Sequence, residues 1–278
     1  MAVRTHQQLL PNIQAIVDSQ LAMFGIPRTV TVRNTIPDTS EIPGSNNPEH
    51  WLRIPDIVCV FVDMKGSTQL SATMHDKGTA GAYQLFTDTA VRILHEFEAA
   101  YIDVRGDGVF ALFNADQVYR SFAAALTFKT FAHRDFTPAM KGKTGIEIGA
   151  HIGIDQKTVL VHKLGLKPYK GRTDRQNEVW VGKPVNMASK LAAIGDTNQL
   201  IVSDRYFKNI SDDLVTWSCG CEIGDFGVKP GTTRYLWSHL DLLHDPKFDF
   251  DVAQVLEADW CPIHGQEYCE AILALDAA

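Results

Sequence analysis

The sequence has no long apolar run and few cysteines. Its longest apolar stretch, residues 57–62, lies between Asp56 and Asp63 and is far shorter than the roughly 18 residues that a transmembrane helix needs. The N-terminus lacks the apolar segment and the small-residue cleavage site of a secretory signal. The five cysteines, an odd number in a chain of 278 residues, fit a reducing cytoplasm better than a disulfide framework. We therefore expect a cytoplasmic protein without a membrane span.

Basic residues are outnumbered by acidic ones. The 26 Lys and Arg residues against 33 Asp and Glu residues give a net charge of −7. Such a chain has no general attraction for a nucleic-acid backbone or an anionic membrane, so a polyanionic ligand must be held locally. We expect neither nucleic acid nor membrane among its partners. With 45% apolar residues, the chain can bury one large core or two modest ones.

Proline and apolar spacing divide the chain into three parts. From Pro11, apolar residues recur at helical spacing and predict an amphipathic helix, whereas the four prolines of residues 25–50 predict an extended arm. We assign residues 1–50 to this N-terminal helix and arm, residues 51–240 to the main domain and residues 241–278 to a C-terminal extension.

The main domain alternates β-rich runs with helical spacing. Strands are expected at residues 57–63, at 145–153 and as a hairpin at 101–113, with helices around 86–97 and 122–126. This β-α-β-β-α-β order is that of a ferredoxin-like α+β fold. Further elements extend the sheet: strands at 158–164 and 199–203, a helix at 184–193, and a last pair of strands between Val215 and Trp237.

Two aspartates should meet at one edge of this sheet. In the ferredoxin-like topology the first strand ends beside the hairpin of the second and third strands, which places Asp63 next to Asp107. Singly, Asp63 could cap the next helix and Asp107 could form a turn; together they would repel unless a cation such as Mg²⁺ or Mn²⁺ lay between them. Gly66, Ser67 and Thr68 then lead into a helix, and backbone N–H groups at such a junction can hold a phosphate.

Four motifs resemble those of class III nucleotidyl cyclases, in the right order, over about residues 52–240. FVDMKGSTQL resembles the first metal motif, RGDGVFALF the second, IGAHIG the glycine-rich strand, and VGKPVNMASKLA the V-N-x-A-S-R helix. The resemblance implies a two-metal enzyme in which Asp63 and Asp107 hold two divalent ions, Mn²⁺ or Mg²⁺. The ions would activate the ribose 3′-hydroxyl of a nucleoside triphosphate for attack on the α-phosphate, with release of pyrophosphate.

The resemblance also implies roles on the V-N-x-A-S-R helix. In the family the Asn, here Asn186, orients the ribose, and the Arg meets the transition-state phosphate. This chain has Lys190 at the Arg position, which keeps the charge but loses the planar bidentate fork. Family members draw the metal aspartates from one subunit and the Asn helix from the other, so we expect a head-to-tail homodimer with its sites at the interface.

The base-reading positions depart from those of purine cyclases. Asp103 stands where purine enzymes typically carry Lys or Glu, and Val179 aligns with their second base-reading residue. Tyr101 and Arg105 instead form a Y-x-x-x-R motif on one face of a strand. The motif resembles that of the pyrimidine cyclases of bacterial Pycsar antiphage systems, whose cyclic UMP or cyclic CMP activates a separate effector protein. The alternative is that Tyr101 packs in the core and Arg105 pairs with a surface acid.

The two pyrimidines differ in what they offer an arginine. Uracil has acceptors at O2 and O4, whereas cytosine carries an amino donor at position 4 that a guanidinium cannot satisfy. UTP is therefore the preferred substrate and CTP the second. Two other functions stay open: a catalytically degenerate sensor that binds a nucleotide, which the lysine at the Arg position allows, and a metal-dependent phosphohydrolase or nucleotidyltransferase built on the same aspartates.

Three further sets of residues are candidates for a function. Five basic residues form a solvated loop or close over a triphosphate: Lys163, Lys167, Lys170, Arg172 and Arg175. His151, inside a strand, is interpreted as a core histidine. A zinc site could join Cys219, Cys221, Cys261 and His264. However, only one residue separates the first two thiols, where structural zinc sites usually have two to four.

Overall fold

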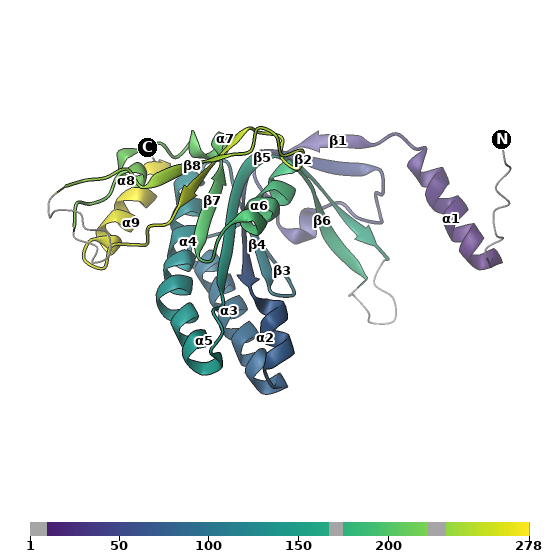
Figure 1. Cartoon of the computed structure of the whole chain (residues 1–278). Helices are drawn as coiled ribbons and strands as arrows, with labels where there is room; N and C mark the ends of the chain where they lie inside the picture. The colour runs from purple at the N-terminus through teal and green to yellow at the C-terminus, as the bar shows by residue number, and fades with distance from the viewer. Residues whose placement is uncertain (1–9, 167–174, 222–231, 278) are drawn as a thin grey trace.

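The computed structural model describes residues 10–166, 175–221 and 232–277 (Figure 1). A nine-stranded mixed sheet forms its centre. The strands are β1 (Thr29–Val32), β2 (His50–Lys65), β3 (Tyr101–Arg105), β4 (Gly108–Phe113), β5 (Gly149–Gly165), β6 (Gln176–Gly182), β7 (Gln199–Ser203), β8 (Trp237–Asp241) and β9 (Val252–Leu256). The main path runs β3-β4-β2-β5-β7-β9-β8, with β1 paired to β2 and β6 paired to β5.

Nine α-helices lie in the described part of the chain, and most of them pack against this sheet or against one another. They are α1 (Pro11–Phe24), α2 (Ser67–Thr73), α3 (Asp76–Glu96), α4 (Val118–Phe131), α5 (Thr137–Thr144), α6 (Lys183–Ile194), α7 (Asp204–Phe207), α8 (Asp213–Thr216) and α9 (Gly265–Ala274). Short 3-10 helices cover Thr39–Glu41 and Leu275–Ala277, and a π-helical turn at Ala132–Phe136 joins α4 to α5. None of the helices in the described part of the chain is both long and apolar enough to cross a bilayer.

The predicted β-α-β-β-α-β unit is present as β2, α3, β3, β4, α4 and β5. Strand β2 lies between β4 and β5 and is antiparallel to both, and β3 pairs with the outer edge of β4. This arrangement confirms the ferredoxin-like α+β fold. The strands predicted at residues 145–153 and 158–164 are one continuous strand, β5, which begins only at Gly149.

Strand alternation divides the buried apolar residues of β2 between two apolar layers. Val60 and Val62 belong to the main core, which includes residues of α3 and α4, whereas Cys59 and Phe61 belong to a second cluster that includes a residue of α6. Because successive side chains of a strand point to opposite faces, Asp63 lies on the same face as Phe61. The end of β2 therefore presents a carboxylate on the α6 face of the sheet.

The predicted N-terminal helix is present as α1, which begins at Pro11 and has no buried residue. Figure 1 shows it beyond β1, set apart from the sheet. The predicted arm is more regular than its prolines suggested. Its Thr-Val-Thr-Val run forms β1, parallel to the start of β2 with Thr29 opposite His50.

The last pair of strands lies later in the chain than predicted. Val215 is in α8, where Asp212 caps the helix by accepting the Leu214 N–H at 2.9 Å. Trp217 and Tyr235 form an isolated bridge, and the antiparallel pair is β8 with β9. A local capping hydrogen bond thus prevails over the β-branched composition of this segment.

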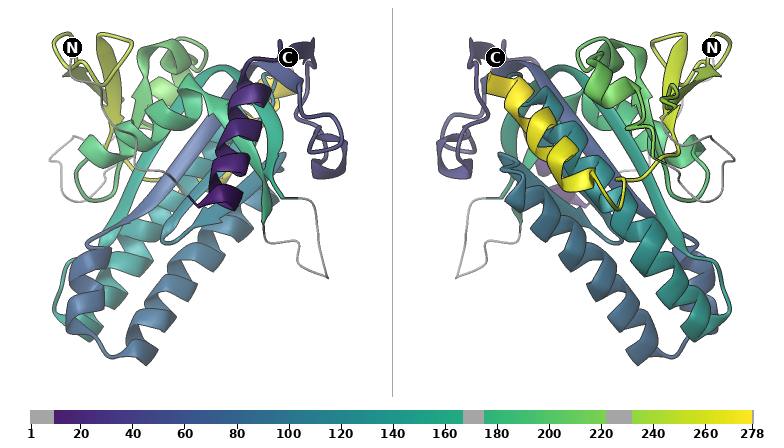
Figure 2. Two further views of the ribbon diagram at one scale, coloured as in Figure 1. Left: turned by 90° about the vertical axis from the view of Figure 1, so that its right-hand side faces the viewer. Right: turned by 90° about the vertical axis from the view of Figure 1, so that its left-hand side faces the viewer.

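Residues after 240 pack with the main sheet. Strand β9 pairs with β7, and α9 lies along α4 (Figure 2). Ile272 of α9 is buried in the main core. At the far end of the chain, Asp276 accepts the backbone N–H groups of Tyr119 at 2.9 Å and Arg120 at 2.8 Å, which caps the start of α4.

Candidate active site

The structure brings Asp63 and Asp107 together. Asp63 is near the end of β2, and Asp107 is in the turn between β3 and β4. Val62 is paired with Val109, so the next residue of β2 lies beside Gly108. A Cβ atom on Gly108 would be 3.4 Å from Asp63 Oδ1. The β3–β4 hairpin therefore places Asp107 close to Asp63, as the topology predicted.

The two carboxylates repel each other in this position. Burial, together with the charge of Asp107, raises the pKa of Asp63 to about 6, against the opposing hydrogen bond from the Met64 N–H. Among the described residues, no ion pair involves either aspartate. A divalent cation would supply the missing positive charge, and carboxylate oxygens are the ligands that Mg²⁺ and Mn²⁺ prefer.

A tight connection follows the first aspartate. Gly66 has a left-handed backbone conformation with a φ of 89°, which glycine adopts without strain. This turn starts α2 at Ser67 within four residues of Asp63. Ser67 is half-buried and Thr68 is exposed, so neither side chain is enclosed in the core.

The two predicted base-reading residues lie on one face of β3 and have partners within the chain. The half-buried Tyr101 ring lies 4.9 Å from Trp180 and 5.8 Å from Phe110, centroid to centroid. Burial and the nearby carboxylate of Asp103 raise the pKa of Tyr101 to about 12. Arg105 donates from Nε to the same carboxylate at 2.8 Å and is 61% exposed. In this single chain, Tyr101 thus packs against core residues and Arg105 pairs with a surface acid, which is the alternative to base recognition given above.

The predicted ribose and phosphate residues lie on α6, which crosses the α6 face of the sheet at Gly153. A Cβ atom there would be 2.0 Å from the carbonyl oxygen of Ala188, so only glycine permits this approach. Asn186 is exposed, and Lys190 donates from Nζ to the carbonyl of Lys247 at 2.7 Å. Among the described residues, no hydrogen bond joins these two side chains to the aspartate pair.

His151 lies directly opposite Asp63 in the β2–β5 register, on the same face of the sheet. It is half-buried, and within the described chain its Nε2 has no hydrogen-bond partner. Burial and the charge of Lys65 lower its pKa. The prediction of a core histidine missed this position beside the carboxylates, which the strand register would have revealed.

The remaining candidates are only partly within the described residues. Lys167, Lys170 and Arg172 lie outside them, whereas Lys163 forms an ion pair with Glu178 at 3.6 Å. The carbonyl of Arg175 accepts the backbone N–H of Leu166 at 2.8 Å. Val179 is half-buried on β6, opposite His162.

Comparisons with known proteins place this geometry in a family. No protein-family model matches the chain. A uridylate cyclase from Propioniciclava tarda is 36% identical over 239 residues, which cover 84% of this chain and 73% of the relative. A uridylate cyclase from Micromonospora echinofusca is 34% identical over 228 residues, covering 80% and 71%. The guanylate cyclase domain of RhGC from Catenaria anguillulae, solved with GTP, superposes with a TM-score of 0.55 at 18% identity and covers 74% of this chain and 98% of that domain. The chain therefore belongs to the uridylate cyclase family and has the catalytic-domain fold of class III nucleotidyl cyclases.

Proposed function

We propose that this chain converts UTP to 3′,5′-cyclic UMP and pyrophosphate. The observation that carries the proposal is the paired carboxylates of Asp63 and Asp107 on a cyclase fold, in a chain 36% identical to a uridylate cyclase. Burial and the charge of Asp107 both raise the pKa of this half-buried aspartate, and a bound cation would favour its charged form against both effects. Both aspartates would hold two divalent ions, Mn²⁺ or Mg²⁺.

Each proposed side chain has a distinct task. The bound ions supply positive charge to the attacking 3′-oxygen and to the phosphates. Backbone N–H groups at Gly66, Ser67 and Thr68 bind phosphate oxygens. Asn186 orients the ribose, and Lys190 neutralises charge on the α-phosphate after its Nζ leaves the carbonyl that it contacts in this structure.

Base recognition is proposed to rest on Tyr101 and Arg105. Positions four apart on a strand are separated by about 13 Å, so the two side chains flank a base rather than contact the same atom. Tyr101, whose ring packs against Trp180, limits the volume for the base. Arg105 exchanges its ion pair with Asp103 for a carbonyl of uracil. The alternative substrate is CTP, which lacks the acceptor at position 4.

We propose that the working enzyme is a head-to-tail homodimer. Two observations support a second copy: the α6 side chains make no hydrogen bond to the aspartate pair within the described part of one chain, and α1 exposes apolar residues such as Ile16 and Leu21. If sites are shared, mixing Asp107→Ala with Asn186→Ala chains restores partial activity through one intact site per heterodimer. No recovery despite demonstrated subunit exchange would contradict the dimer.

The cellular role proposed here follows from the family resemblance. Cyclic UMP would act as a second messenger in antiphage defence and activate a separate effector protein. A cytoplasmic location agrees with the five cysteines, none of which forms a disulfide in the structure.

The test is incubation with each of the four ribonucleoside triphosphates and Mn²⁺, with products identified by mass. We expect UTP to yield cyclic UMP and pyrophosphate far faster than ATP or GTP yields its cyclic product. Tyr101→Ala and Arg105→Ala should erode this preference, whereas Asp88→Asn, an exposed change on α3, should preserve it. Vigorous cyclic AMP or cyclic GMP synthesis by the unmodified protein would overturn the assignment. Hydrolysis without a cyclic product would favour a phosphohydrolase, and binding without turnover a sensor.

A further inference from the structure

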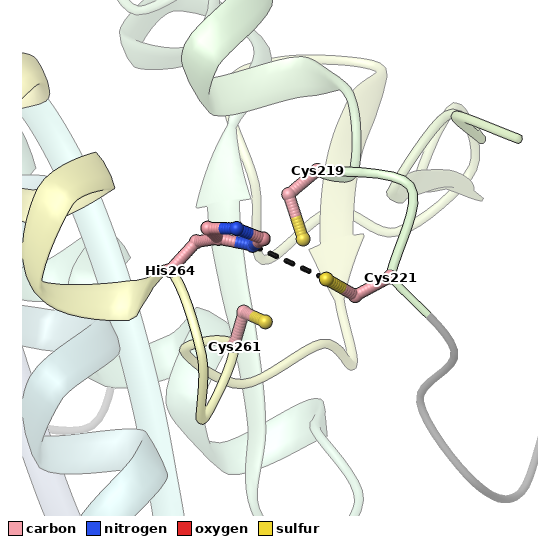
Figure 3. Close-up of side chains that lie close together, drawn as sticks. All are labelled: Cys219, Cys221, Cys261 and His264. Atoms are coloured by element: carbon pink, nitrogen blue, oxygen red, sulfur yellow. Dashed lines mark hydrogen bonds between the residues drawn. The ribbon is translucent and has the colours of Figure 1, made fainter. Parts of the chain in front are cut away.

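Three thiols and one imidazole, none of them used by the proposed active site, converge in the structure (Figure 3). The sulfur atoms of Cys219, Cys221 and Cys261 and a ring nitrogen of His264 all lie within 4.8 Å of one another. Cys221 Sγ is 3.1 Å from His264 Nδ1. All three cysteines are free, so no disulfide accounts for their convergence. They come from two chain segments, one between α8 and β8 and the other immediately before α9.

The second segment is fixed by contacts that do not involve the thiols. Lys129 of α4 is buried and donates from Nζ to the carbonyl of Glu257 and to Asp259 Oδ1, each at 2.7 Å. The Trp260 N–H donates to Thr130 Oγ1 at 3.1 Å. Because these bonds hold the backbone up to residue 260 against α4, the next residue, a cysteine, has a defined position.

The turn that follows brings Cys261 and His264 close together. The Gly265 N–H donates to the carbonyl of Cys261 at 2.7 Å, and the Tyr268 N–H donates to that of His264 at 2.9 Å. A Cβ atom on Gly265 would be only 3.0 Å from the Cβ of Trp260. The result is a compact Cys-x-x-His turn that leads into α9.

The first segment has its own support. The Ser218 N–H donates to the carbonyl of Arg234 at 2.9 Å, and Trp217 is bridged to Tyr235. Gly220, between the two thiols, has a φ of 76°. This left-handed conformation lets a Cys-x-Cys sequence turn within one residue. The short spacing that counts against zinc in the sequence is thereby accommodated.

We propose that Cys219, Cys221, Cys261 and His264 bind one Zn²⁺ ion in a tetrahedral Cys₃His site. Zn²⁺ takes thiolate and imidazole ligands at about 2.3 Å and 2.0–2.1 Å, which places the ligand atoms of a tetrahedron within the spread observed here. Four protein ligands leave no open position, so the site is structural rather than catalytic. Its effect is to fasten the start of α9 to the segment that precedes β8.

The electrostatics of the cluster agree with a cation. The three sulfur atoms lie within 4.8 Å of one another and of the His264 ring nitrogen. Three thiolates cannot share this volume unless positive charge lies between them. A divalent ion provides that charge, and a coordinating thiol is then deprotonated.

The first test is the metal content of the full-length protein, purified under reducing conditions without added metal salts. We expect one zinc per chain by elemental mass spectrometry. Cys261→Ser and His264→Ala should lose most of it, whereas Cys269→Ser, which removes a thiol of α9 outside the cluster, should keep it. Exchange with Co²⁺ should give the absorption spectrum of tetrahedral cobalt with thiolate ligands, a measurement that needs no variant and so stands even if the variants fail to fold.

A second test follows the thiols in the unmodified protein. Cys219, Cys221 and Cys261 should resist alkylation until a zinc chelator is added, and chelation should also increase amide exchange along α9. Protein that contains no zinc and whose three thiols alkylate freely would overturn the proposal. A disulfide detected within the cluster, or bound iron in place of zinc, would overturn it as well.

Discussion

Replacing Asp63 with Asn should stabilise the metal-free protein while removing its activity. The pKa of this aspartate is raised from 3.8 to about 6 in the folded chain, so the folded state binds the proton more tightly than the unfolded state does. The free energy of unfolding therefore falls as the pH rises from about 4 to about 6 and remains reduced above that range. Asparagine has nearly the same shape and no charge, so it avoids this cost.

The size of the effect follows from the shift. About two pKa units correspond to roughly 3 kcal/mol, but the carboxylate is only half-buried, and solvent screening reduces the expected gain to about 1 kcal/mol. For a chain of 278 residues, this raises the melting temperature at pH 8 by about 2 °C. A ligand present at 100 times its Kd stabilises a folded protein by about 2.7 kcal/mol. Saturating Mn²⁺ should therefore reverse the order of stability and make the unmodified protein more stable than Asp63→Asn.

The assay is thermal unfolding at pH 5 and pH 8, with and without Mn²⁺, alongside cyclic UMP formation. At pH 5 the metal-free advantage of Asp63→Asn should shrink, because Asp63 is then mostly protonated in the folded chain. Asp88→Asn, on the exposed side of α3, should show none of these changes. Destabilisation of Asp63→Asn at pH 8 without metal, or a full Mn²⁺ shift in that variant, would refute the reasoning.

The ferredoxin-like unit could be predicted from the sequence because its signals are local. Apolar runs, helical spacing and a Gly-Asp-Gly turn specify each element, and the known topology then places Asp63 beside Asp107. The ion pair of Arg105 with Asp103 could also be predicted from the sequence. Residues two apart on a strand share a face, so an acid at this spacing competes with a base for the guanidinium.

Other features depend on contacts between distant segments. The zinc ligands at Cys219 and Cys261 converge because Lys129 and Asp259 hold one segment, whereas Gly220 turns the other. No periodic pattern or motif in the sequence indicates these contacts. Spacing alone therefore counted against a site that the tertiary structure assembles.

Two further predictions concern contacts between strand β5 and the helices that pack on it. Arg205→Met leaves Asp155, which is fully buried, without the guanidinium that donates to it at 2.7 Å, so we expect the unfolding free energy to fall by about 3–5 kcal/mol in urea titrations. A fall below about 1 kcal/mol would show that water replaces the arginine. Gly153→Ala places a methyl group 2.0 Å from the carbonyl oxygen of Ala188, and because that neighbour is backbone, α6 must move away from the sheet. We expect a lower melting temperature together with reduced cyclase turnover. Gly142→Ala, which adds the same group where nothing lies within 4 Å, should preserve both, and equal behaviour of the two variants would contradict the close approach of α6.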